Sequence, residues 1–129
     1  LMIGVNDQYR SRPVRDFEGE FKRLLKRARA FAGGNASRTF AISVPDWGAT
    51  PFSEGRDRSV IGKEIQAYND RAKELSEAAG IIWVDVTEVS RAMQTDPTLV
   101  AVDGLHPTGA MYARWAELIH PYALTALRT

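Results

Sequence analysis

The sequence predicts an α/β fold that is built on a parallel sheet, as one domain over residues 1–129. Three short apolar segments, at 1–5, 39–44 and 81–86, have the composition of buried strands. Between them lie longer segments in which apolar residues recur every three or four positions, as in amphipathic helices. Near-continuous apolar strands separated by helices are typical of parallel sheets that are covered on both faces.

All three predicted strands end in polar sequence. The first, LMIGV at 1–5, runs directly into Asn6, which we expect in a loop. TFAISV at 39–44 stops at PDWG, 45–48, because proline cannot donate a hydrogen bond to the sheet and glycine permits a turn. The third strand is IIWVDV at 81–86. Because ligands bind at the carboxyl ends of parallel strands, we expect these loops to meet at one rim.

The predicted helices are bounded by recognisable signals. The apolar period at 17–32 is followed by two glycines, and the period at about 58–79 is followed by Gly80, as at a helix C-terminus. The last helix is expected to begin near Thr108 and to be kinked at Pro121. We find no internal repeat and no linker.

The composition excludes several classes of protein. The 17 basic and 16 acidic residues leave a net charge of +1, which does not favour nucleic acid as a partner. The densest basic run, at 22–31, alternates with apolar residues and is interpreted as the exposed face of a helix. The chain has no cysteine, which excludes disulfides, thiolate zinc sites and cysteine nucleophiles.

The sequence contains no recognisable membrane-spanning or targeting segment. No apolar run approaches the roughly 20 residues of a membrane span, and no signal peptide is visible at Leu1. We expect a soluble protein, and its compartment stays unassigned.

The strongest chemical signal is the sequence VDGLHPTG, in which Asp103 precedes His106 by three positions. A carboxylate that accepts the Nδ1 proton of a histidine leaves Nε2 free to take a proton from a nucleophile. The start of a helix at Pro107 and Thr108 would hold this loop rigidly. In the alternative interpretation, Asp103 only makes a turn and His106 is a surface residue.

Asn6 is the second candidate for a catalytic residue, whereas no nucleophile can be identified. An amide at a strand end can donate a hydrogen bond to a developing oxyanion, although asparagine is also an ordinary turn residue. None of the serines lies in a glycine-flanked elbow of the G-x-S-x-G type. Ser53 is the only serine expected near the rim, and nothing beside it would activate it.

The two motifs together resemble the SGNH (GDSL) hydrolases. GVND at 4–7 resembles the third conserved block of that family, and DGLHP at 103–107 resembles the fifth; SVPDWGATPF at 43–52 is similar to a segment of one bacterial branch. The resemblance implies a flavodoxin-like three-layer αβα fold and serine-dependent ester hydrolysis without metal or cofactor. It also implies that His106 is the general base, that Asp103 orients it and that Asn6 is an oxyanion donor.

The first two blocks of the family have no counterpart here, neither the Gly-Asp-Ser motif nor the glycine of the second block. The resemblance therefore implies that 1–129 is the C-terminal portion of an incomplete domain, preceded by on the order of 60 residues in a complete member. The nucleophile serine would lie outside this chain. We expect the missing N-terminal segment, or another chain, to pair with the 1–5 edge, and we expect the chain alone to be inactive and poorly soluble or self-associated.

Three functions stay open at this point. The first is an SGNH-type hydrolase of a small-molecule ester, with Asp46, Trp47 and Phe52 as candidate substrate contacts. The second is a non-catalytic binding or regulatory module of the same fold, in which the apolar loop at 47–52 contacts a ligand. The third is a metal-dependent hydrolase. Its candidate ligands are Asp46, Asp85, Asp103 and His106.

Overall fold

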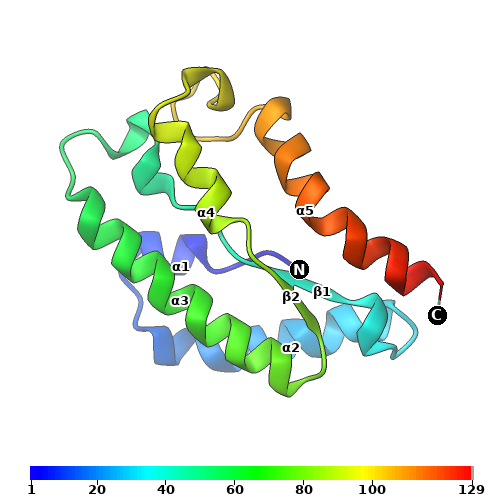
Figure 1. Ribbon diagram of the computed structural model, residues 1–129. Helices are drawn as coiled ribbons and strands as arrows, with labels where there is room; N and C mark the ends of the chain where they lie inside the picture. Colours follow the sequence, from blue (N-terminus) through cyan, green and yellow to red (C-terminus); the bar gives the residue numbers. More distant parts are fainter. Residues whose placement is uncertain (129) are drawn as a thin grey trace.

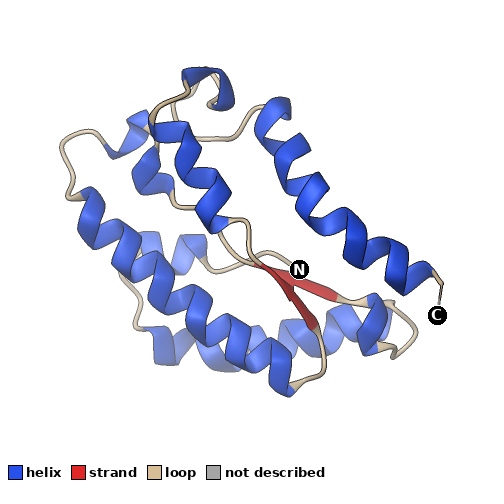
Figure 2. Cartoon of the chain, in the orientation of Figure 1, coloured by secondary structure: helices blue, strands red, loops and turns tan. Residues whose placement is uncertain are grey.

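Two parallel strands lie at the centre of the computed structural model, which describes residues 1–128 (Figures 1 and 2). They are β1 (Phe40–Ile42) and β2 (Ile82–Val84), paired in register from Phe40 opposite Ile82 to Ile42 opposite Val84. The predictions of strands within 39–44 and 81–86 are confirmed. The fold is therefore α/β with a small parallel sheet.

The prediction of a strand over 1–5 is wrong. Only Leu1 lies beside β1: its amino group donates to the Phe40 carbonyl at 2.7 Å, and Ile42 N–H donates to the Leu1 carbonyl at 2.9 Å. This is the pattern of a single parallel bridge. The chain then leaves the extended conformation at Gly4, whose φ of 126° is readily adopted only by glycine.

Asn6 is therefore in a helix and not in the expected loop. Helix α1 (Val5–Tyr9) follows Gly4 immediately, and Gln8 is its buried residue. A Cβ atom at Gly4 would lie 3.1 Å from the ring of Phe17, so the packing of the neighbouring helix also requires glycine there.

The three long helices confirm the sequence predictions. They are α2 (Val14–Phe31), α3 (Arg58–Ala78) and α5 (Gly109–Leu127), which continues through Pro121. A short helix, α4 (Thr87–Ser90), follows β2 and was not predicted. Single 3-10 turns occupy Ala36–Arg38, Trp47–Ala49, Pro51–Ser53, Arg91–Gln94 and Pro97–Leu99.

Helices cover both faces of the sheet. Successive strand residues point to opposite sides, so neighbouring residues of β1 contact different helices. Ala41 belongs to the core cluster formed with α2 and α3, whereas Ile42 packs against the cluster that includes α5. Figure 1 shows α2 and α3 together on one side of the strands and α5 on the other. The first cluster contains Phe17, Phe21, Leu25, Tyr68, Ala72, Leu75 and Ile81. The second contains Ala49, Val86, Met93, Leu99, Met111 and Trp115.

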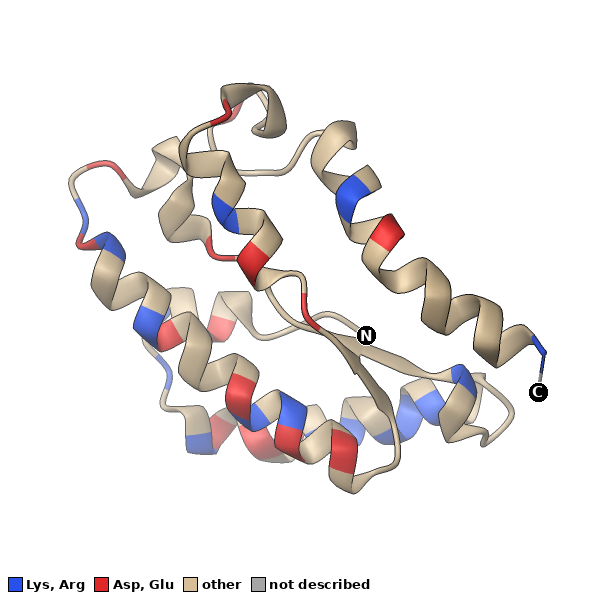
Figure 3. Cartoon of the chain, in the orientation of Figure 1, with Lys and Arg blue, Asp and Glu red and all other residues tan. Residues whose placement is uncertain are grey.

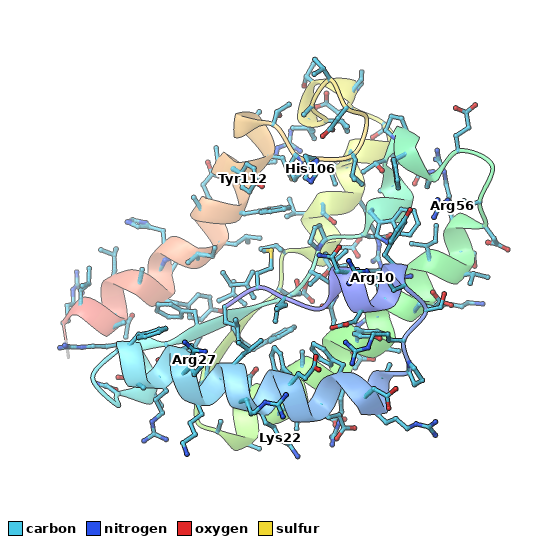
Figure 4. The ribbon with its side chains drawn as sticks, turned by 180° about the vertical axis from the view of Figure 1, so that it is seen from behind. Arg10, Lys22, Arg27, Arg56, His106 and Tyr112 are labelled. Atoms are coloured by element: carbon cyan, nitrogen blue, oxygen red, sulfur yellow. The ribbon has the colours of Figure 1, made fainter. Side chains whose placement is uncertain are left out.

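Charge is unevenly distributed over these layers. Charged residues of both signs are frequent on α2 and α3, whereas few lie on α5 (Figure 3). The basic run at 22–31 lies along the exposed face of α2, with Lys22 and Arg27 on its surface, as expected (Figure 4). Within residues 1–128, no helix is both long enough and apolar enough to span a membrane.

A buried hydrogen-bond network fixes the carboxyl ends of both strands. The amide of Asn69, from α3, accepts from Val44 N–H at 2.9 Å and donates to the Val44 carbonyl at 3.2 Å. It also donates to the Thr87 hydroxyl at 2.9 Å. Thr87 Oγ1 in turn lies 2.8 Å from Ser43 Oγ. Asn69 thus ties the strand exits to the longest helix.

We expect Asn69→Ala to lower the free energy of unfolding by about 1–3 kcal/mol, because it leaves the buried Val44 N–H without a partner and removes one of the two donors to the Val44 carbonyl, which keeps the Thr87 hydroxyl. Urea denaturation measures the change. Gln66→Ala, which removes an exposed amide from the same helix, is the matched control and should change stability by less than about 0.5 kcal/mol. Equal effects of the two substitutions would contradict the importance of the network.

Candidate active site

A cavity of about 270 Å³ opens where the strand exits meet α1 and the loop before α5. Its walls are mostly apolar or aromatic, with two of the sequence-predicted polar residues among them. The lining residues are Val5, Asn6, Tyr9, Pro45, Trp47, Phe52, Met93, Leu105, His106 and Pro107. Segments far apart in the sequence therefore build one concave site. Of the three loops expected to meet there, only the one after β1 lines it as a loop, because residues 5–9 are helical and residues 85–87 are not part of the lining.

The loop that carries His106 is a tight hairpin closed by backbone hydrogen bonds. Ala101 N–H donates to the His106 carbonyl at 2.7 Å, and Thr108 N–H donates to the Leu99 carbonyl at 2.9 Å. The turn at its tip needs Gly104, whose φ is 72°. Figure 4 shows His106 held in this loop ahead of α5.

Asp103 and His106 form the expected contact. Asp103 Oδ2 lies 2.5 Å from His106 Nδ1, and its other oxygen accepts from the backbone N–H groups of Leu105 and His106, each at 2.9 Å. The hydrogen bond from His106, followed by those backbone bonds, lowers the pKa of Asp103 to about 2. The carboxylate is thus fixed by its own turn and is ionised at neutral pH. The catalytic roles of the pair stay predictions.

The pair is open to solvent. The His106 side chain is 69% exposed and that of Asp103 is 48% exposed. Within residues 1–128, His106 Nε2 has no hydrogen-bond partner, and His106 lines the cavity. The imidazole therefore has one nitrogen occupied by the carboxylate and the other available to a reacting group.

Asn6 lines the same cavity from α1. Its backbone carbonyl accepts from Arg10 N–H at 3.1 Å. Its exposed side-chain amide makes no hydrogen bond to any other part of the chain from 1 to 128. A short helix holds this amide at the cavity, and its two N–H groups can donate to a bound ligand.

The candidate contact residues divide into two groups. Trp47 and Phe52 line the cavity. Asp46 is buried behind them, where its carboxylate accepts from Gly48 N–H at 3.0 Å and pairs with Arg91 Nε at 3.1 Å. The structure therefore brings Asn6, His106, Trp47 and Phe52 together at the cavity. The carboxylate of Asp46 instead holds the loop after β1 through Gly48 and Arg91.

No serine is among the residues of the described chain that line this cavity. Ser53 is fully buried, and its hydroxyl lies 2.8 Å from the carbonyls of both Gly48 and Thr50. Ser43 and Ser90 are also fully buried, and each makes hydrogen bonds within the loops that leave the strands. Among residues 1–128, the cavity is therefore lined by an imidazole and a side-chain amide but by no serine.

Sequence reasoning missed the ring of Tyr9. It contacts Trp47 and Phe52, with centroid distances of 5.5 and 6.1 Å, and completes an aromatic wall. Asn6 and Tyr9 are three positions apart and share one helix face. That spacing was a usable signal only if the segment was recognised as helical, which the strand prediction prevented.

The carboxylates of the strand exits do not gather around His106. Asp85 Oδ1 lies 2.9 Å from Ser43 Oγ and accepts from Thr87 N–H at 2.8 Å. In the part of the chain that the structure describes, no three His, Cys, Asp or Glu residues are grouped so that they could hold a metal ion. The four ligands proposed for a metal-dependent hydrolase are therefore not assembled.

The chain thus combines a parallel α/β sheet, a cavity at the rim of that sheet and an Asp-x-x-His pair. Residues 1–114 match the GDSL-like Lipase/Acylhydrolase family. The chain therefore belongs to that family, which indicates action on esters. No curated protein and no solved structure matches the chain.

We expect the pKa of Asp103, measured by carboxyl ¹³C NMR during acid titration, to lie near 2 and to rise toward 3.8 in His106→Ala. The rise should be incomplete, because the backbone N–H groups still donate to the carboxylate. The depressed pKa stabilises the fold above pH 3.8, and that stabilisation is lost as the pH falls from 3.8 toward 2.

Asp96 provides the control for this titration. Its pKa is lowered mainly by the side-chain hydrogen bond from Thr98 and should not respond to the loss of His106. An unchanged Asp103 titration in His106→Ala would show that the imidazole does not hold the carboxylate.

Proposed function

We propose that the protein is an SGNH-type serine ester hydrolase that acts by acyl transfer, and that the serine comes from polypeptide outside residues 1–129. The observation that carries this proposal is the Asp103–His106 pair at a cavity that Asn6 also lines. Family membership supports ester hydrolysis, and the absence of a serine from the cavity lining within 1–128 supports an external nucleophile.

In the proposed mechanism, His106 Nε2 takes the proton of the serine hydroxyl as its oxygen attacks the ester carbonyl. The carbonyl π electrons move to the oxygen, and the Asn6 amide donates a hydrogen bond to that oxyanion. His106 then gives the proton to the departing alcohol as the ester C–O bond breaks. Water hydrolyses the acyl-enzyme in the same way, with His106 again as base and then acid, and the serine is restored.

Asp103 acts in this scheme through His106. Its carboxylate selects the imidazole tautomer that carries hydrogen on Nδ1, and it stabilises the imidazolium that forms when Nε2 accepts the proton. The depressed pKa of Asp103 supports this role, because the carboxylate stays charged across the pH range in which an imidazole titrates. No metal or organic cofactor enters any step of the proposal.

We also propose that the complete domain is flavodoxin-like, with further strands beside the segment at 1–4. The parallel pair β1 and β2, covered by helices on both faces, supports this arrangement. Met2 and Ile3 are 38% and 41% exposed, which supports a covering segment at this edge. That segment, from the same protein or another chain, would bring the serine to His106.

A non-catalytic binding module is the second candidate. The observation that favours it is the same cavity, which is rich in aromatic and aliphatic side chains and has no serine from residues 1–128. Under this proposal, Trp47 and Phe52 bind a ligand, and the Asp103–His106 pair only stabilises its loop. Ester turnover by a complete form separates the two functions.

In the complete form, we expect His106→Ala to lower kcat/KM for p-nitrophenyl acetate by about 10³-fold or more, because the base is lost. Asn6→Ala should lower kcat by about 10²–10³-fold through the loss of an oxyanion donor. His120→Ala, which removes an exposed histidine from α5, is the control and should leave turnover unchanged. Near-normal turnover by His106→Ala would exclude the proposed base.

We further expect that residues 1–129 alone are not labelled by a serine-reactive phosphonate, and that addition of the serine-bearing segment restores labelling on that segment. Mass spectrometry of the labelled peptides assigns the site, and size-exclusion chromatography reports association. Labelling of a monomeric 14.3 kDa chain on one of its own serines would show that the nucleophile lies within it.

A further inference from the structure

The guanidinium of Arg56 rests over the aromatic wall of the cavity. Its Cζ atom lies 5.2 Å from the ring centroid of Tyr9, 5.3 Å from that of Trp47 and 5.4 Å from that of Phe52. The three rings also contact one another and line the cavity that contains His106. A positive charge therefore lies against the aromatic side chains of the cavity, in an adjoining hollow that shares Tyr9 and Trp47 with it.

The backbone places Arg56 there through a tight turn. Arg56 N–H donates to the Ser53 carbonyl at 3.0 Å. Glu54 has φ −54° and ψ 135°, and Gly55 has φ 76°. These are the angles of a type II turn, which favours glycine at its third position. The position of Arg56 is thus built into the loop, and the contact with the rings adds to it.

Arg56 forms no close ion pair within the described chain. None of the carboxylates in residues 1–128 forms an ion pair with it, and its one hydrogen bond there reaches Tyr9 Oη at 3.4 Å. Asp57 and Glu64, which share a hollow with Arg56, have other partners: Asp57 caps α3, and Glu64 accepts from Gln8 Nε2 at 2.8 Å.

A guanidinium in this setting is prepared for an oxyanion. The three rings contact it through cation–π interactions, and because the Arg56 side chain is exposed, its N–H groups can donate to a carboxylate or phosphate in pairs. Arg10, next to Tyr9 in the sequence, is a second exposed cation.

We propose that Arg56 binds an oxyanion group of the ligand, so that the substrates are small anionic esters. This inference rests on the proposed function. The ester lies at His106, the hydrocarbon part crosses Tyr9, Trp47 and Phe52, and a carboxylate or phosphate at the far end meets Arg56. The three rings thus set the distance required between the ester and the anionic group of the substrate.

Binding of simple analogues tests this proposal without turnover. The probes are hexanoate, its neutral isostere hexanamide, and hexyl phosphate, titrated into the ¹⁵N-labelled complete form. The indole N–H signal of Trp47 reports binding, because this group donates to Gln8 Oε1 at 2.7 Å beside the rings, and Trp47→Phe assigns the signal. We expect hexanoate to bind roughly three- to tenfold more tightly than hexanamide. Comparison with hexyl phosphate decides between the two oxyanions.

Arg56→Gln should abolish the preference for hexanoate, and Arg56→Lys should retain part of it. Arg27→Gln is the matched control, because it removes an exposed arginine of α2 away from the cavity and should keep the full preference. Equal affinity for hexanoate and hexanamide, no binding of either up to its solubility, or an intact preference in Arg56→Gln would overturn the proposal.

Turnover by the complete form then separates this inference from the proposed function. The substrates are mono-4-nitrophenyl adipate, which is anionic, and neutral 4-nitrophenyl hexanoate. We expect the kcat/KM for the anionic ester divided by that for the neutral ester to fall by roughly three- to tenfold in Arg56→Gln. If the complete form hydrolyses both esters and this ratio does not change in Arg56→Gln, the anion site is contradicted but the esterase function is not. If the protein prefers hexanoate but hydrolyses neither ester, only the esterase function is contradicted.

Discussion

The hydrogen bonds between Asn69 and the backbone of Val44 are the constraint on which the rest of the structure depends. They fix β1 where it leaves the sheet, and Thr87 extends the same network to the exit of β2. Every loop that follows a strand begins from these anchored points. A buried, satisfied polar network of this kind gives the loops one starting geometry, which an apolar core would not specify.

The Asp103–His106 pair has little support from burial. Its geometry comes from the turn at Gly104, from the backbone N–H groups that bind the carboxylate and from the hairpin bonds around it. In water, attraction between such exposed groups is weak, so charge stabilisation by the pair depends on exclusion of solvent. The covering segment proposed at 1–4 and the substrate itself are the two candidates for that role.

Sequence patterns predicted the long helices well, because α2, α3 and α5 each have an apolar face with helical spacing. The contact between Asp103 and His106 was also predictable, since it is local. The segment at 1–5 was misread because its composition favours a strand, whereas the positive φ of Gly4 ends the extended conformation, and a side chain there would meet the ring of Phe17. Arg56 could not be foreseen, since its partners Tyr9 and Trp47 are brought to it only by the fold.

One further bond gives the site a property of its own. Phe52 N–H donates to the Gly104 carbonyl at 2.9 Å, which joins the aromatic loop to the turn that holds the imidazole. A ligand that shifts the Phe52 ring therefore pulls on the backbone two residues before His106. Occupancy of the apolar wall and the position of His106 are therefore mechanically linked, so a poorly fitting ligand would displace the imidazole from the position that the proposed reaction requires.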